Sequence, residues 1–460
     1  MTRSRRHRDR AANEPRRHRD RAATEPRLRR DRAATEPRSR QAGVVTVSQP
    51  VRDLALLPAD GADAARRAEF AACVGLLVEG VYATCFGPAL PVLASDFGVS
   101  LDTVGLLLTM FFAGSIATSA LVAARLHRRD PHQVAVAGLC AAALGVAGLA
   151  VAGEFRVALA ATLLMGAGDG LLVAGAHLLV ARASADIPRG MNRLNLYFAF
   201  GAMLGPLWAG SVLQFAAPGR AIAFGGVALA VAFAAVAMAR ASSPSPSPSP
   251  SPSPGNRDSG RGSEVAPAAG GVGVLAALMG AVLFLYVGAE FGLGSWVATY
   301  AAREFGTGLF TGGVVTSCYW GALLLGRFAS GQLFARGWQP SRVLLLSIGG
   351  SLIASAAIAA AHGVFAIVVL AALATGLFLG PVWPAVMSIV AARSTGGAPA
   401  SIVTVGNAGG VFFPWLQGRL IVQAGATTGI ALTALLCGAM LLLAGIARVL
   451  PDGAREGRRR

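Results

Sequence analysis

The chain has 460 residues, of which 54% are hydrophobic and only 14% are charged. Soluble domains carry about 25% charged residues, so this composition predicts an integral membrane protein. Much of the net charge of +17 comes from the N-terminal segment. All 40 basic residues are arginine, which excludes a GxxxxGK[ST] phosphate loop and argues against a nucleotide-driven motor.

The N-terminal segment contains an eleven-residue repeat, RRHRDRAANEP, RRHRDRAATEP and RLRRDRAATEP. Regularly spaced prolines and the near absence of large apolar side chains leave nothing to bury. Residues 1–67 are therefore predicted to be a disordered, arginine-rich cytoplasmic tail. We expect it to be solvated, without a nucleic-acid partner.

From Phe70 onward, apolar segments of about 20 residues recur, and each is long enough to cross a bilayer. The pattern predicts twelve membrane-spanning helices, at residues 70–93, 103–124, 133–153, 157–181, 194–216, 220–240, 272–300, 310–334, 342–361, 363–391, 398–422 and 427–449.

The loops between these spans alternate in charge. Arginine is concentrated in RLHRRDPHQ, RASADIPRGMNR, ARGWQPSR and the tail REGRRR, which predicts cytoplasmic N- and C-termini. A Ser-Pro linker at residues 241–270 separates two six-helix lobes, at 68–240 and 271–450, and a basic tail follows at 451–460. Two such lobes are typical of secondary transporters, here expected in the plasma membrane.

Five stretches carry a resemblance to a known family. They are RGMNRLNLYFAFGAMLGPLWAG, LYVGAEFGLGSWVATY, SCYWGALLLGRFASGQL, GLFLGPVWPAVMSIV and GNAGGVFFPWLQGRL. They resemble the major facilitator superfamily, and most closely its fucose/glucose-type proton symporter branch. The resemblance implies an all-α fold whose first, fourth, seventh and tenth helices line a central cavity. The loop AARLHRRDPHQ departs from the family pattern, with Arg128 in place of an acid and Pro131 in place of a glycine.

Three carboxylates stand well inside predicted spans, and they fall on the first, fourth and seventh: Glu79, Asp169 and Glu290. An ionised carboxylate facing lipid costs at least ~2.5 kcal/mol on insertion scales, so each should face a polar interior or carry a proton. We therefore expect them to couple transport to protons, together with His177, which lies about two turns beyond Asp169. The alternative for each is a hydrogen bond that joins two helices.

Other polar and aromatic side chains inside the spans are candidate solute contacts. Glycines and aromatic rings around Glu290 are typical of a sugar site. With Glu290, the expected solute-binding residues are Trp296, Tyr300, Asn195, Asn407 and Trp383. Arg327 is expected to form an ion pair with a carboxylate or a solute oxygen. Pro381 and Pro384 should break the tenth helix near Trp383.

These features predict a monomeric, non-enzymatic transporter without cofactor or metal, whose partners are the lipid bilayer, a small polar, sugar-like solute and a proton. Neither GxSxG nor HExxH occurs in a polar setting, and no cysteine belongs to a CxxC pair. Two alternatives stay open. One is a proton-coupled drug or metabolite efflux antiporter, since GAMLGPLWAG also resembles an antiporter motif. The other is a membrane sensor or scaffold that does not transport.

Overall fold

The structure is a computed structural model, which describes residues 59–126, 129–184, 186–241, 271–361, 363–393 and 398–449. The chain divides into two units, residues 1–48 and 49–460, and all described residues belong to the second. The expectations for residues 1–58, for the linker after Ala241, for the tail after Val449 and for Arg128 lie outside the described residues.

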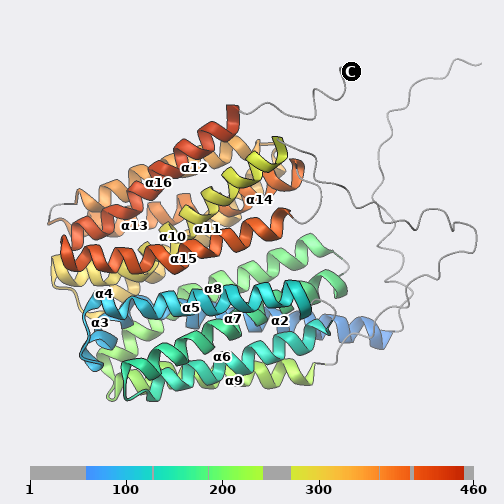
Figure 1. The fold of residues 1–460 in the computed structure, drawn as a ribbon, viewed down its shortest axis with the longest axis horizontal. Coiled ribbons are helices and arrows are strands. Elements are labelled where there is room, and N and C mark those ends of the chain that lie inside the picture. The colour runs from blue at the N-terminus through green and yellow to red at the C-terminus, as the bar shows by residue number, and fades with distance from the viewer. Residues whose placement is uncertain are drawn as a thin grey trace, which may run out of the picture. The chain divides into compact units, whose positions relative to one another are not determined.

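The first half of the described chain consists of helices that run back and forth (Figure 1). They are α2 (Ala59–Thr84), α3 (Phe86–Asp96), α4 (Leu101–Val104), α5 (Leu106–Leu121), the π-helix η1 (Val122–Leu126), α6 (Pro131–Val151), α7 (Phe155–Ala183), α8 (Ile187–Phe215) and α9 (Gly219–Arg240).

The second half has the same character. It contains α10 (Gly271–Phe305), α11 (Leu309–Ala335), α12 (Pro340–Ala359), α13 (Phe365–Leu379), α14 (Val382–Arg393), α15 (Ala398–Gln423) and α16 (Ala426–Val449).

Each of the twelve predicted spans coincides with one helix or with consecutive helices. Ten stretches of the described residues are long and apolar enough to cross a membrane, and α2 with α3, bent by 48°, makes an eleventh. The remaining predicted span is α15, whose 26 residues include Arg419 and Gln423. The predicted break of the tenth span is present, since α13 ends at Leu379 and α14 begins at Val382.

The first helix differs from the prediction, because it begins at Ala59 and not near Phe70. The stretch after Pro58 is rich in alanine, the best helix former. An ion pair between Asp63 and Arg66, three residues apart on the helix, supports this first part of α2. The helix therefore extends into the segment expected to be tail.

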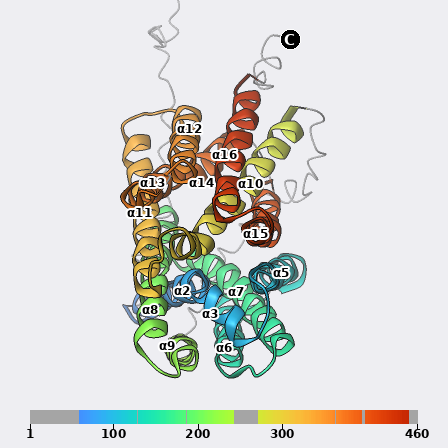
Figure 2. The ribbon, with the colours of Figure 1, turned by 90° about the vertical axis from the view of Figure 1, so that its left-hand side faces the viewer.

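The helices pack in two groups. In the first, α2 packs on α8, and α7 packs on both α5 and α6; in the second, α10 packs on α15 and α16, and α11 packs on α13. We call them the N-terminal lobe (α2–α9) and the C-terminal lobe (α10–α16). They lie side by side in both views (Figures 1 and 2). Contacts between the lobes join α8 to α11, α5 to α15 and α3 to α10.

Two hydrogen bonds join the lobes toward one end of the helices. The hydroxyl of Thr109 on α5 donates to Val411 O on α15 at 2.8 Å, and Phe310 N on α11 donates to Gln214 of α8 at 2.8 Å. We call this end, where α3 ends and α11 begins, the closed end. Further along α8 and α11, Phe200 is 45% exposed and Phe328 57%. The lobes diverge toward this opposite, open end, where α8 and α10 begin (Figure 1).

Candidate functional site

Two of the predicted acids meet inside the N-terminal lobe. Glu79 of α2 and Asp169 of α7 are both buried, and Asp169 contacts Tyr82, which lies one turn after Glu79 on the same helix. Ser115 Oγ of α5 donates to Asp169 Oδ2 at 2.7 Å, and Tyr82 Oη donates to Oδ1 at 3.4 Å. We call Glu79 and Asp169 the acid pair.

A glycine next to Asp169 brings α5 close enough for this arrangement. A Cβ atom at Gly170 would lie only 2.2 Å from the backbone oxygen of Ser115. The helices can approach this closely because no side chain separates their backbones. The hydroxyl of Ser115 consequently reaches the Asp169 carboxylate from a neighbouring helix.

The third predicted acid forms an ion pair inside the C-terminal lobe. Arg327 Nη2 of α11 donates to Glu290 Oε1 of α10 at 2.8 Å, and the side chains are 18% and 4% exposed. Tyr286 Oη donates to the same Oε1 at 2.8 Å and accepts from Arg327 Nη2 at 3.2 Å. Tyr319 Oη donates to the backbone oxygen of Glu290 at 3.0 Å. The predicted pairing of Arg327 with a carboxylate is thus present in the structure.

The break between α13 and α14 lies directly beside Arg327. A Cβ atom at Gly380 would lie 2.7 Å from the backbone nitrogen of Arg327, so only glycine allows this approach. Just after the break, the half-buried ring of Trp383 packs against Tyr286 with centroids 6.2 Å apart. Helix α14 therefore places an aromatic face next to the Glu290–Arg327 ion pair.

Aromatic rings connect the two clusters. Successive ring contacts, with centroids between 4.8 and 6.3 Å apart, lead from Tyr82 in the N-terminal lobe to Tyr319 in the C-terminal lobe, through Phe111, Phe112, Phe291 and Trp320. The Phe112–Phe291 contact crosses between the lobes. Arg327 is also close enough for its charge to act on Glu79. The acid pair and the ion pair thus belong to one region between the lobes.

Three predicted solute contacts have partners elsewhere. Trp296 is buried and donates to Pro414 O of α15 at 2.7 Å. Tyr300 donates to Ile358 O of α12 at 3.1 Å, inside the C-terminal lobe. Asn195 is exposed and donates to Met191 O, one turn earlier on its own helix.

Two further predicted residues are half-buried. Asn407 lies on α15, and His177 lies on α7 between Asp169 and the open end. His177 Nδ1 is 2.7 Å from Val173 O of its own helix.

Four partners of the acids were not predicted as site residues: Tyr82, Ser115, Tyr286 and Tyr319. A signal existed for two of them. Tyr82 follows Glu79 by three residues and Tyr286 precedes Glu290 by four, and both spacings place side chains on one helix face. Ser115 and Tyr319 come from other helices, so no local spacing indicates them.

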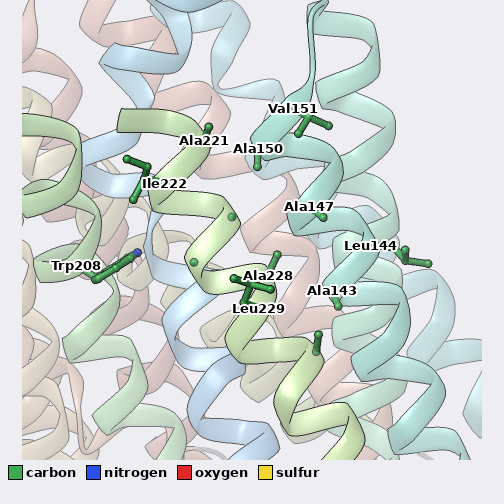
Figure 3. A pocket seen from close by; sticks show the side chains of 13 residues that line it. Ala143, Leu144, Ala147, Ala150, Val151, Trp208, Ala221, Ile222, Ala228 and Leu229 are labelled. Atoms are coloured by element: carbon green, nitrogen blue, oxygen red, sulfur yellow. The ribbon is translucent and has the colours of Figure 1, made fainter. Parts of the chain in front are cut away.

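A cavity of about 670 Å³ lies away from these polar clusters, between α6 and α9, with Trp208 of α8 at its edge (Figure 3). Its lining is apolar and includes Leu144, Ala147, Ile222 and Leu229. Leu144 and Leu229 are 66% and 75% exposed, as expected for side chains that face lipid. The indole N–H of Trp208 donates to Ala223 O at 2.9 Å, so this groove offers a polar solute no free hydrogen-bonding side chain. Among the described residues, no group of His, Cys, Asp or Glu has the arrangement of a metal site.

The family model and the similar solved structures point to the same family. The model of the Major Facilitator Superfamily matches residues 72–395, and no curated protein sequence matches the chain significantly. Similar solved structures include the D-xylose–proton symporter, 12% identical over 84% of this chain and 98% of that chain, with a TM-score of 0.66. The E. coli fucose:proton symporter is 18% identical over 82% of this chain and 98% of that one, with a TM-score of 0.55. A nucleoside transporter is 12% identical over 84% and 99%, with a TM-score of 0.61. At these identities the likeness shows a shared fold.

Proposed function

Because the chain belongs to the Major Facilitator Superfamily and is a multi-pass membrane protein, we propose that it is a secondary active transporter that moves a small polar, sugar-like solute together with protons. The two lobes would expose a central site alternately to each side of the plasma membrane.

The buried acid pair is the observation that carries proton coupling. Glu79 and Asp169 are both buried, and they come from two different helices of the N-terminal lobe. Two buried negative charges close together are costly in a low-dielectric interior, so we expect at least one of the two acids to carry a proton. The state of the pair is therefore tied to the packing around it, as coupling requires. His177 lies between the acid pair and the open end, and it is the candidate group for relaying protons between them.

The distribution of charge supports a cytoplasmic open end. Arginines stand at the ends of α7 and α11 and at the beginnings of α8 and α12: Arg182, Arg189, Arg193, Arg336 and Arg342. Acids stand at both ends, but the described arginines are fewer at the closed end, where Arg156, Arg220 and Arg303 lie beside Asp96, Asp102, Glu154 and Glu304. The positive-inside rule then assigns the open end to the cytoplasm, and the structure to an inward-facing state.

The composition of the site supports a polar solute. Glu290 and Arg327 offer hydrogen-bonding groups, while the half-buried Trp383 offers an aromatic face of the kind that packs on sugar rings. We keep Glu290, Trp383 and Asn407 as solute contacts. Two structural neighbours are symporters of the sugars xylose and fucose with protons, which agrees with this choice of solute.

Uptake by proteoliposomes under an imposed pH gradient tests the proposal. A panel of labelled sugars should include at least one that accumulates when the exterior is more acidic than the lumen. Asp169→Asn should abolish the accumulation, whereas Glu154→Gln, an acid just before the same helix, should leave it unchanged. Accumulation that ignores the gradient contradicts proton symport. Drug-like cations driven in the opposite sense would indicate an efflux antiporter, and binding without transport would indicate a sensor.

A further inference from the structure

Arg327 has unused hydrogen-bonding capacity. Its Nη2 serves both Glu290 and Tyr286, while its buried Nε donates to no group among the described residues. A guanidinium group offers five N–H donors in a rigid fork that matches a carboxylate with two parallel bonds. In the structure the Glu290 carboxylate occupies only one corner of this fork. The guanidinium group thus keeps donor capacity for a second acceptor.

We propose that Arg327 binds a carboxylate of the transported solute, which replaces Glu290 when Glu290 accepts a proton. This inference rests on the proposed transport function and narrows its solute to a sugar acid. The side chain of Arg327 is 18% exposed, whereas that of Glu290 is 4% exposed, so the guanidinium is the partner that a solute can reach.

The exchange keeps the charge of the site constant. Before binding, Arg327 is neutralised by Glu290; afterwards it is neutralised by the solute carboxylate, and Glu290 is an uncharged acid. One proton therefore enters the site with each solute anion. The protonated Glu290 still has a partner, because the Tyr286 hydroxyl lies 2.8 Å from its Oε1 and can turn from donor to acceptor.

Among the titratable groups in this region, Glu290 is the one that accepts the proton. Tyr286 comes from α10 and Tyr319 from α11, and both are hydroxyls. Cys437 of α16 is buried close to Tyr319, and Glu79 of the N-terminal lobe lies close to Arg327.

Trp383 constrains the part of the solute that lies next to its carboxylate. Its half-buried ring lies against Tyr286, whose hydroxyl touches both members of the ion pair. A ligand with its carboxylate on Arg327 would therefore place its neighbouring atoms beside an aromatic face. A hexuronate has this shape, with a sugar ring directly attached to a carboxylate.

The test compares ligands that differ only at the carboxylate, using purified full-length protein. Thermal stabilisation and calorimetric affinity are measured with D-glucuronate and D-galacturonate, with the parent hexoses, and with the uronate methyl esters. At least one uronate should bind about ten to a hundred times more tightly than its hexose and its ester, the factor expected of a charge-assisted bond. Its affinity should rise as the pH is lowered, since proton uptake accompanies binding. Equal affinity for a uronate and its hexose, or no binding of any uronate, would overturn the proposal.

Variants test the assignment to Arg327. Arg327→Lys keeps the charge without the fork and should weaken binding of the uronate more than binding of its parent hexose. The double variant Glu290→Gln with Arg327→Gln removes both charges, so no unpaired buried charge is left to prevent folding. It should abolish the preference for the uronate. Arg336→Gln, on the exposed residue after α11, is the control with full binding. Retention of the preference in the double variant would refute the role of Arg327. Neutral sugars carried with protons, without uronate binding, would refute this inference alone.

Discussion

Replacing Glu290 and replacing Arg327 should lower the free energy of unfolding by different amounts. Removing one member of a buried pair typically costs about 3–5 kcal/mol. Glu290→Gln leaves Arg327 charged, and a guanidinium cannot lose its proton in a protein, so this variant should lie in that range. Arg327→Gln leaves Glu290, which can accept a proton and keep its hydrogen bond with Tyr286. Its cost should be nearer about 1–3 kcal/mol, the penalty of an impaired buried hydrogen bond.

The two variants should also respond differently to pH. In Arg327→Gln, the folded state takes up a proton at Glu290 more readily than the unfolded state, because burial opposes the charge. Stability relative to the wild type should therefore recover as the pH falls, while the deficit of Glu290→Gln stays constant. The assay is thermal unfolding of purified protein in detergent between about pH 5 and pH 8, with the double variant completing a cycle. Additive effects within about 0.5 kcal/mol, or a deficit of Arg327→Gln that ignores pH, would refute the pairing.

Three further predictions concern the acid pair, the helix packing and the closed end. Asp169→Asn should remove solute accumulation driven by a pH gradient but preserve exchange of labelled for unlabelled solute, which needs no net proton movement; loss of both would show general damage. Gly326→Ala places a Cβ atom 2.0 Å from a backbone oxygen of α13 and should cost about 1–3 kcal/mol, whereas Gly331→Ala, with open space around it, should be tolerated in the same unfolding assay. Thr109→Cys with Val411→Cys, in a background without the native cysteines, should form a disulfide across the closed end. Uptake should then stop until a reductant is added, and undiminished uptake by the cross-linked protein would contradict alternating access.

Hydropathy and proline positions were sufficient to predict most of the fold. Each predicted span has a helical counterpart, and the break at Gly380 and Pro381 follows from the prolines around Trp383. The bend between α2 and α3 was not predicted, although a signal was present. Pro88 cannot donate the hydrogen bond that would reach Thr84, the last residue of α2. The start of α2 at Ala59 was missed because hydropathy does not register an alanine-rich polar helix.

The site was only partly predictable, because spacing fixes a direction on a helix but not what lies opposite. Trp296 and Tyr300 follow Glu290 by six and ten residues, which turns them about 120° and 80° away from its face. They accordingly pack against α15 and α12. The meeting of Glu79 with Asp169 depends on how α2 and α7 rotate and pack, and no pattern within either segment contains that information.

Proton movement measured with the solute itself tests the central claim most directly. Proteoliposomes in a weakly buffered suspension receive the solute that binds best, and a pH electrode follows the exterior. Proton-coupled transport through the acid pair predicts that the medium becomes more alkaline when solute enters, and that Glu79→Gln or Asp169→Asn abolishes this change. Entry of solute into wild-type proteoliposomes with no change in external pH would contradict it.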